Sequence, residues 1–304
     1  MDKASTPKQD PDRRSRIAAQ RAAAQRTRLR NRLLIAGGAI VVVVVVVVVF
    51  VVIGGNGSSG GGKVPTPPTG SALAQTISQL TSVPVTTSDT VGAGNATSPP
   101  TTISGTPLTS GGKPEMLYVG AEYCPYCAAE RWSIIVALSR FGTFTGLQTT
   151  HSAAADGAGT AEPYPNTATW TFAHSTFTSD YLTFSPVEIE TNVPDKATGA
   201  YTTLQTPTKA QQALVNKYDA AYQDAIPFID IGNKYLSVGA SYDPSVLSGL
   251  TWSQIATDLH NPDSPVAKSV LGGANYLTAA ICGLTNDQPA SACTATVKGM
   301  RTKI

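Results

Sequence analysis

Two cysteines three residues apart, Cys124 and Cys127, are the residues of this chain whose types and spacing best fit a chemical task. They enclose a Pro-Tyr pair and stand between a short apolar run at 116–121 and a helix-length run at 128–141. This order predicts a buried strand, a loop and a helix that begins at or near Cys124, with Pro125 at the first helical position. Unpaired backbone N–H groups and the helix dipole would then favour the thiolate of Cys124. The pattern therefore predicts a thiol–disulfide exchange centre in which Cys124 attacks and Cys127 resolves the mixed disulfide.

Two other uses of this cysteine pair stay open, half of a zinc site and an inert disulfide. A zinc site needs two further ligands, and the candidates are His151, His174 and the other two cysteines of the chain. None of these shows the paired spacing that is typical of metal ligands. We therefore predict no metal site and no cofactor.

The second cysteine pair, Cys282 and Cys293, differs in kind, because ten residues separate the two and they follow a helical pattern. All four cysteines lie after residue 53, and an even number of cysteines favours disulfides in an oxidising compartment. We interpret this pair as a structural disulfide that holds the C-terminal loop. The alternative is a relay pair that exchanges electrons with Cys124 and Cys127.

Residues 116–141, which include Tyr-Val-Gly-Ala-Glu-Tyr-Cys-Pro-Tyr-Cys, resemble the strand–CxxC–helix unit of the thioredoxin superfamily, and the Pro-Tyr pair is similar to that of glutaredoxins. Residues 226–235, Ile-Pro-Phe-Ile-Asp-Ile-Gly-Asn-Lys-Tyr, resemble the cis-proline strand and hairpin of that superfamily. The resemblance implies an α/β fold, with a central mixed sheet flanked by helices. It also implies that Pro227 is cis and that the Ile226 backbone pairs with an extended substrate. Tyr126 joins these two as a predicted substrate-binding residue.

From about residue 71 to 296 the chain is similar to membrane-tethered proteins grouped as domain-of-unknown-function family 929, through the phrases GAEYCPYCAAERW and AAICGLTNDQPASAC. That likeness implies a thioredoxin-like fold and no established substrate. Two features depart from the thioredoxin pattern. Thioredoxins often keep a buried Asp six residues before the first cysteine, where this chain has Tyr118, so Glu122, water or another group would have to accept the proton. Residues 153–207 form a long insertion, which would shape a substrate groove or cover a sheet edge.

The N-terminal part of the chain predicts a membrane anchor. Residues 1–32 hold ten Lys and Arg side chains and carry a net charge of +7, although the whole chain carries only +2. They precede residues 33–53, which contain no charge and no proline. A helix of that length spans roughly 30 Å, the thickness of the hydrocarbon core of a bilayer. The positive-inside tendency predicts a single-pass protein of the cell membrane, with a cytoplasmic N-terminus and an extracytoplasmic C-terminal domain.

Two rival interpretations of this region are a cleaved signal peptide and a nucleic-acid-binding tail. The apolar region of a signal peptide usually has about 7–15 residues and ends at a small-residue cleavage site, whereas this stretch is longer and leads into Gly-Gly-Asn-Gly. The basic residues abut the apolar stretch, where a topology signal belongs, and the near-neutral total charge favours no nucleic-acid partner. The single-pass anchor is the interpretation that fits both observations.

The rest of the chain divides by composition and periodicity. Residues 54–70 are rich in Gly, Ser and Pro and predict a tether, followed by an extracytoplasmic domain at 71–304. Within that domain we expect a lead-in at 71–112, a thioredoxin-like core at 113–152 and 208–260, the insertion at 153–207, and a C-terminal helix and loop at 261–304. The expected strands are 116–121, 147–152, 169–172, 181–190, 227–231 and 234–238, and the expected helices are 71–80, 128–141, 208–224, 244–259 and 264–280.

These expectations combine into a membrane-anchored thiol–disulfide oxidoreductase. Its partners would be exported proteins with cysteines or a membrane redox partner, and whether it acts as oxidase, reductase or isomerase depends on its reduction potential. The alternative is a non-catalytic thioredoxin-like adaptor that binds peptides or a membrane partner beside Pro227. Two cysteines at a helix start favour the enzyme.

Overall fold

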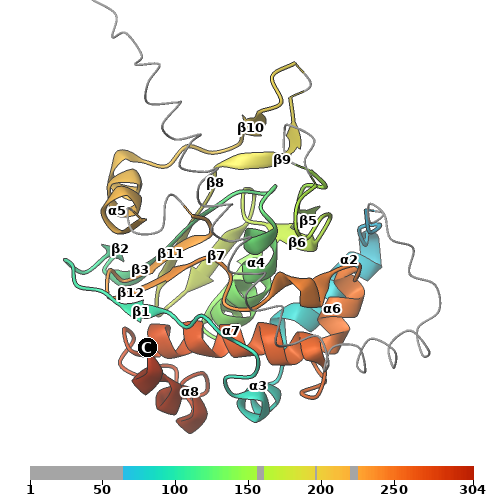
Figure 1. The fold of residues 1–304 in the computed structure, drawn as a ribbon. Coiled ribbons are helices and arrows are strands. Elements are labelled where there is room, and N and C mark those ends of the chain that lie inside the picture. Colours follow the sequence, from blue (N-terminus) through green and yellow to red (C-terminus); the bar gives the residue numbers. More distant parts are fainter. Residues whose placement is uncertain (1–63, 156–160, 196, 220–224) are drawn as a thin grey trace, which may run out of the picture. The chain divides into compact units, whose positions relative to one another are not determined.

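The computed structural model describes residues 64–155, 161–195, 197–219 and 225–304, which form an α/β fold with a mixed central sheet (Figure 1). The predicted basic tail, the transmembrane helix at 33–53 and most of the tether lie outside these residues. Among the helices that the structure describes, none combines the length and the hydropathy needed to cross a bilayer.

The strand before the first cysteine, β3 (Lys113–Gly120), lies at the centre of the sheet. On one side it pairs antiparallel with β11 (Phe228–Ile231), which pairs with β12 (Tyr235–Val238) through a tight hairpin. Gly232 and Asn233 form the turn with φ of 68° and 53°, the positive values that a two-residue turn of this kind requires. β3 also pairs in parallel with β8 (Thr183–Glu188).

Alternate residues of β3 face two different hydrophobic clusters, as the period of two in a strand dictates. Met116 and Tyr118 join the larger cluster with α4 (Pro125–Ser139) and α7 (Pro265–Cys282), which pack against each other. Leu117 and Val119 face the smaller cluster, which α5 (Lys209–Asp219) covers. The sheet therefore lies between helices, and α4 lies in the main core (Figure 1).

The remaining elements surround this centre. The edge strands β1 (Thr101–Thr102) and β2 (Thr109–Ser110) pair with β12 and β3, and three two-stranded sheets pair β4 with β7, β5 with β6 and β9 with β10. These strands are β4 (Gly142–Thr145), β5 (Gln148–His151), β6 (Ala168–Thr171), β7 (Thr176–Ser179), β9 (Glu190–Pro194) and β10 (Tyr201–Thr203). The other helices are α2 (Gly70–Thr81), α3 (Val85–Val91), the 3₁₀ helix η1 (Pro244–Leu247), α6 (Trp252–Asp258), α8 (Ala295–Met300) and the 3₁₀ helix η2 (Arg301–Lys303).

The expected single helix at 244–259 is wrong, because the structure contains two shorter helices there, η1 and α6. Asp243 caps the first and Pro244 opens it. The chain then leaves the helix at Gly249, whose φ is 73°. Thr251 restarts a helix with a capping box, in which its side chain and that of Gln254 bond reciprocally to the backbone.

The segment at 153–207 is more than an insertion, because it supplies a strand of the central sheet. The parallel neighbour of β3 is β8, and the expected strand at 147–152 forms β5, which pairs only with β6. The alternation of Thr with aromatic residues in this segment predicts β structure at 181–190. The paired residues of β3 and β8 are 68 positions apart in the sequence, and a local pattern cannot predict such a partner. The lead-in at 71–112 also contributes to the sheet, through β1 and β2 at its margins.

Candidate functional site

Cys124 lies at the N-terminus of α4, where its side chain caps the helix. The backbone N–H of Cys127 donates to Cys124 Sγ over 3.3 Å, and Pro125 occupies the first helical turn. This is the arrangement that the sequence predicts, and it uses one of the backbone donors that a helix start leaves unpaired. Cys124 is 5% exposed and Cys127 is fully buried behind it. Both are free thiols.

The two sulfurs differ in their ionisation. Burial raises the pKa of the Cys124 thiol, but hydrogen bonds from the Cys127 side chain and backbone, the charge of Arg131 and a hydrogen bond from the Tyr126 backbone together lower that pKa below its ordinary value. Burial raises the pKa of Cys127, and the neighbouring Cys124 raises it further. The geometry therefore favours a thiolate at Cys124 and a protonated thiol at Cys127, the distribution that an attacking and a resolving cysteine need.

The three predicted substrate-binding residues lie in two places around Cys124. The Ile226–Pro227 peptide bond is cis and immediately precedes β11. When Cys124 is a thiol, its Sγ donates to the Ile226 carbonyl oxygen over 3.7 Å, so this loop contacts the sulfur directly. Tyr126 follows Cys124 by two residues, and its ring is 41% exposed and packs edge-on against Tyr164.

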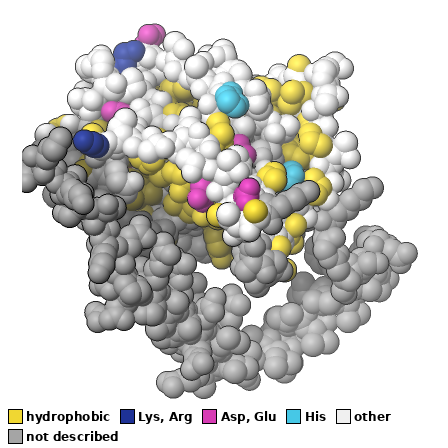
Figure 2. Space-filling view, turned by 90° about the horizontal axis from the view of Figure 1, so that it is seen from above, with side chains coloured by type: hydrophobic (Ala, Val, Ile, Leu, Met, Phe, Trp, Pro, Cys, Tyr) yellow, Lys and Arg dark blue, Asp and Glu magenta, His cyan; other side chains and the backbone are white. Residues whose placement is uncertain are grey.

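The loop between β3 and Cys124 is held from several sides. The Glu122 N–H donates to the Glu190 carbonyl over 2.9 Å, and the Ala153 N–H donates to the Tyr123 carbonyl over 2.9 Å. The Tyr123 ring stacks on Tyr201 of β10, with ring centroids 4.3 Å apart. The segment 153–207 thus provides a strand of the sheet and also contacts the loop that carries Cys124. Figure 2 looks onto the end of the molecule where β9 and β10 lie, whose described surface is mostly uncharged, with apolar patches between scattered charged groups.

A buried ion pair lies one helical turn beyond Cys127, and the sequence analysis missed it. The side chains of Arg131 and Glu188 are both 0% exposed. Arg131 Nε donates to Glu188 Oε1 over 2.9 Å and Nη2 donates to Oε2 over 2.6 Å. Nη2 also donates to the Ala121 carbonyl over 2.7 Å. Arg131 within a helix of mostly apolar residues was the available signal, because an arginine on such a buried helix must have a partner.

Tyr118, six residues before Cys124, cannot act as a base for the cysteine pair. Burial raises the pKa of Tyr118 well above its ordinary value, so the phenol keeps its proton. A Cβ atom on Gly120 would lie 3.1 Å from Cys127 Sγ and would overlap the Tyr118 hydroxyl oxygen. The hydroxyl and the Cys127 sulfur therefore border the same small space, which only a glycine at position 120 leaves open.

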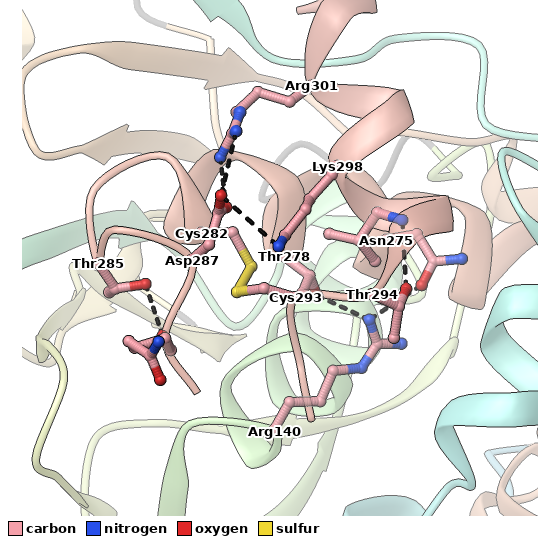
Figure 3. Close-up of a disulfide and its surroundings, with 12 residues drawn as sticks. Arg140, Asn275, Thr278, Cys282, Thr285, Asp287, Cys293, Thr294, Lys298 and Arg301 are labelled. Carbon is pink, nitrogen blue, oxygen red and sulfur yellow. Dashed lines mark hydrogen bonds and ion pairs between the residues drawn. A yellow bond between two sulfur atoms is a disulfide. The ribbon is translucent and has the colours of Figure 1, made fainter. Parts of the chain in front are cut away.

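The second cysteine pair forms a disulfide, Cys282–Cys293, at the end of α7 (Figure 3). Beside it, Asp287 pairs with Arg301 over 2.7 Å and with Lys298 over 3.7 Å, which ties the loop to α8 and η2. Cys282, Asp287 and Cys293 are the one group of three potential metal ligands within reach of one another among the described residues, and the disulfide occupies both of its sulfurs.

Comparison with known proteins gives one match. No curated protein and no solved structure matches the chain. Residues 99–283, which include β3, the cysteine pair, the Ile226–Pro227 loop and α7, match the family described as Domain of unknown function (DUF929). The match covers more than half of the chain, and the chain belongs to this family.

Proposed function

We propose that this protein is a thiol–disulfide oxidoreductase with a thioredoxin-like domain. The order of four strands supports the thioredoxin-like part of the proposal. β8, β3, β11 and β12 lie side by side, with β8 parallel to β3 and the other two pairs antiparallel. The helix after β3 starts with the cysteine pair, and the loop before β11 contacts Cys124.

The observation that carries the proposal is the placement of two free thiols at one helix start. Cys124 Sγ accepts a backbone hydrogen bond and lies against the Ile226 carbonyl, while Cys127 lies behind it, fully buried. A purely structural cysteine pair needs neither free thiols nor a thiol with a lowered pKa. A lowered thiol pKa is typical of reactive cysteines.

The exchange balances in both bonds and electrons. The Cys124 thiolate attacks a substrate disulfide, one substrate sulfur leaves as a thiolate, and a mixed disulfide forms. Cys127 loses its proton to water and attacks Cys124 Sγ, so the Cys124–Cys127 disulfide forms and the second substrate thiolate leaves. The substrate gains two electrons and the cysteine pair loses two. The reverse sequence oxidises a substrate dithiol, and the reduction potential relative to the partner sets the direction.

The proposed setting is the outer side of the cell membrane. Residues 33–53 would anchor the chain, with residues 1–32 in the cytoplasm, and exported proteins with cysteines or a membrane redox partner would be the substrates. Tyr126, Ile226 and Pro227 would contact the substrate chain beside Cys124, since Tyr126 is exposed and the Ile226 carbonyl contacts the reacting sulfur.

A disulfide-exchange assay on the full chain tests the proposal. We expect the protein to catalyse the reduction of insulin by dithiothreitol, and Cys124→Ser to abolish this activity because the attacking sulfur is lost. Asp263→Asn, at a carboxylate that is exposed and outside the site, serves as the control that retains both cysteines. Equal rates for the wild type and Cys124→Ser would refute the enzyme and leave the peptide-binding adaptor as the better account.

A further inference from the structure

A contribution to stability alone does not explain the position of the buried ion pair Arg131–Glu188. Two charges taken out of water cost several kcal/mol each, and well-packed apolar residues of the same volume often serve stability as well or better. This pair joins α4 to the last residue of β8, and Glu188 pairs in register with Gly120 at the end of β3. It therefore lies directly behind the loop that carries Cys124.

The guanidinium is oriented more strictly than an ion pair requires. Three of its hydrogen bonds use Nε and Nη2, two to the Glu188 carboxylate and one to the Ala121 carbonyl. Glu188 Oε1 also accepts the Phe172 N–H over 3.2 Å, which fixes the carboxylate in turn. The remaining nitrogen, Nη1, is buried and has no hydrogen-bond partner in the structure. A charged donor is thus held in the core with one nitrogen left unpaired.

A second unpaired donor lies beside it. The Tyr118 hydroxyl is buried without a hydrogen-bond partner, and the Arg131 guanidinium carbon lies 5.9 Å from the centre of the Tyr118 ring. That hydroxyl borders the same space as Cys127 Sγ, next to Gly120. Arg131 follows Cys127 by four residues on α4, so both project from one face of the helix. Buried donors without partners are costly, and a group that becomes an anion during a reaction would give them a partner.

Cys127 is the group that must become an anion in this space. The described ionisable groups that interact with it are Cys124 and Arg131 on α4, Tyr118 on β3 and Tyr123 in the loop, and Glu188 on β8 is the partner of Arg131. Arg131 lowers the pKa of both cysteines, and it is the one cation among these groups. The anion formed at Cys127 would otherwise lie in a fully buried position beside a second sulfur.

We propose that Arg131 is a positioning residue for the exchange centre: its buried guanidinium, fixed by Glu188 and the Ala121 carbonyl, holds a positive charge that favours the Cys127 thiolate when Cys127 attacks the mixed disulfide. This proposal rests on the proposed function. In this proposal the buried charge of Arg131 assists the resolving step. The thioredoxin pattern places a carboxylate near that step, at the position where this chain has Tyr118.

The test follows the resolving step with a small reagent, dithiobis(nitrobenzoate), so that no protein substrate is needed. Cys124 attacks the reagent, releases one coloured thiolate and forms a mixed disulfide. Cys127 then attacks Cys124 Sγ, the intramolecular disulfide forms and the second coloured thiolate leaves. The rate of the second release in the reduced full chain, measured against pH, reports the ionisation of Cys127.

Four variants separate charge from structure. Arg131→Met with Glu188→Gln removes both charges and leaves no buried ion unpaired, so we expect the midpoint of the pH profile to rise by about one unit or more. Arg131→Lys keeps the charge and should keep the wild-type midpoint. Glu188→Gln alone removes the counter-charge and should lower the midpoint. Arg140→Met is the matched control, since the Arg140 side chain is partly buried at the C-cap of α4, where it bonds to Asn275 and Thr278 at the end of the helix away from the cysteines, and it should leave the midpoint unchanged.

An unshifted midpoint of the pH profile in the folded double variant would overturn the proposal. A higher midpoint in Glu188→Gln would also overturn it, as would a midpoint in Arg131→Lys that shifts as far as that of the double variant. Circular dichroism establishes that each variant is folded. Because Glu188→Gln and the double variant should shift the midpoint in opposite directions, either one still tests the proposal if the other does not fold. A wild type that releases both thiolates but reduces no protein disulfide would refute the proposed function and leave this inference intact.

Discussion

At the residue scale, opposing effects on one sulfur set the pKa of Cys124. Burial disfavours its thiolate, whereas the hydrogen bonds from Cys127 and the Tyr126 backbone and the charge of Arg131 together favour it more strongly, so its pKa lies below the ordinary value. The hydrogen-bond donors come from the first turn of α4. The Cys-Pro-Tyr-Cys spacing alone indicates this chemistry, because a cysteine at a helix N-cap meets these donors whatever the rest of the fold is.

The ionisation of Cys124 can be measured in the Cys127→Ser variant, where Cys124 is the free thiol that remains and the serine hydroxyl still donates. The alkylation rate by iodoacetamide should follow a pH profile with a midpoint below about 8.5, the ordinary value for cysteine. Exposure limits the absolute rate, so the midpoint and not the rate is the quantity to compare. A midpoint at or above the ordinary value would contradict the description of Cys124 as the attacking thiol.

At the scale of elements, the local units of the fold could be predicted from the sequence and their partners could not. The Gly232-Asn233 turn and the Cys124 cap of α4 each depend on a few adjacent residues, and each lies where the pattern predicts. The parallel pairing of β3 with β8 depends on residues far apart in the chain. So does the partner of Arg131, which is 57 residues away.

The helix α4 carries a second buried charge, Glu130, which does not contact the cysteines. Its carboxylate accepts the N–H and the hydroxyl of Ser241 over 2.8 and 2.7 Å, and burial raises its pKa from 4.5 to about 7. A raised pKa means that the native protein binds this proton more tightly than the unfolded chain does. The contribution to stability is therefore full below about pH 4.5 and is lost as the pH rises through about 7.

Replacing Glu130 by glutamine should remove that dependence on pH. We expect the loss of unfolding free energy between about pH 5 and pH 8 to shrink by about 2 kcal/mol in Glu130→Gln, since one pKa unit corresponds to about 1.4 kcal/mol. Urea unfolding at both pH values measures it, and Asp263→Asn, at a carboxylate that is 92% exposed, is the control. An unchanged difference would show that Glu130 has an ordinary pKa in the folded protein.

Gly120 is the residue of β3 whose lack of a side chain matters most to the site. An added Cβ would overlap the Tyr118 hydroxyl and approach Cys127 Sγ to 3.1 Å. We expect Gly120→Ala to lower the free energy of unfolding by about 1–3 kcal/mol, because overpacking a core forces neighbours to move. Gly299→Ala, in α8 with nothing within 4 Å, should be neutral or stabilising by up to about 1 kcal/mol. Thermal or urea unfolding of both variants compares them, and equal effects would contradict the crowding at Gly120.

At the scale of the whole molecule, the two cysteine pairs are in different states. The Cys282–Cys293 disulfide closes a loop at the end of α7 and lies among the ion pairs of Asp287 (Figure 3). Cys124 and Cys127 are free thiols at the start of α4. We interpret the first pair as structural and the second as reactive. A relay between the pairs is the alternative that an experiment must exclude.

Replacing both cysteines of the disulfide by serine distinguishes these tasks. We expect Cys282→Ser with Cys293→Ser to lower the free energy of unfolding by about 2–4 kcal/mol, the usual effect of losing such a bond, and to leave the rate of disulfide exchange unchanged. Denaturant unfolding and the insulin assay measure the two quantities on the same sample. A stable variant with lost turnover would support the relay.

The central claim is that Cys124 forms covalent bonds with substrate proteins, and trapping tests it most directly. In cells that make the full-length Cys127→Ser variant, the mixed disulfide cannot be resolved by Cys127, so we expect covalent adducts on non-reducing gels that a reductant releases. The Cys124→Ser variant should form none of them. Absence of adducts with Cys127→Ser, or the same adducts with both variants, would contradict the claim that these two cysteines are a thiol–disulfide exchange centre.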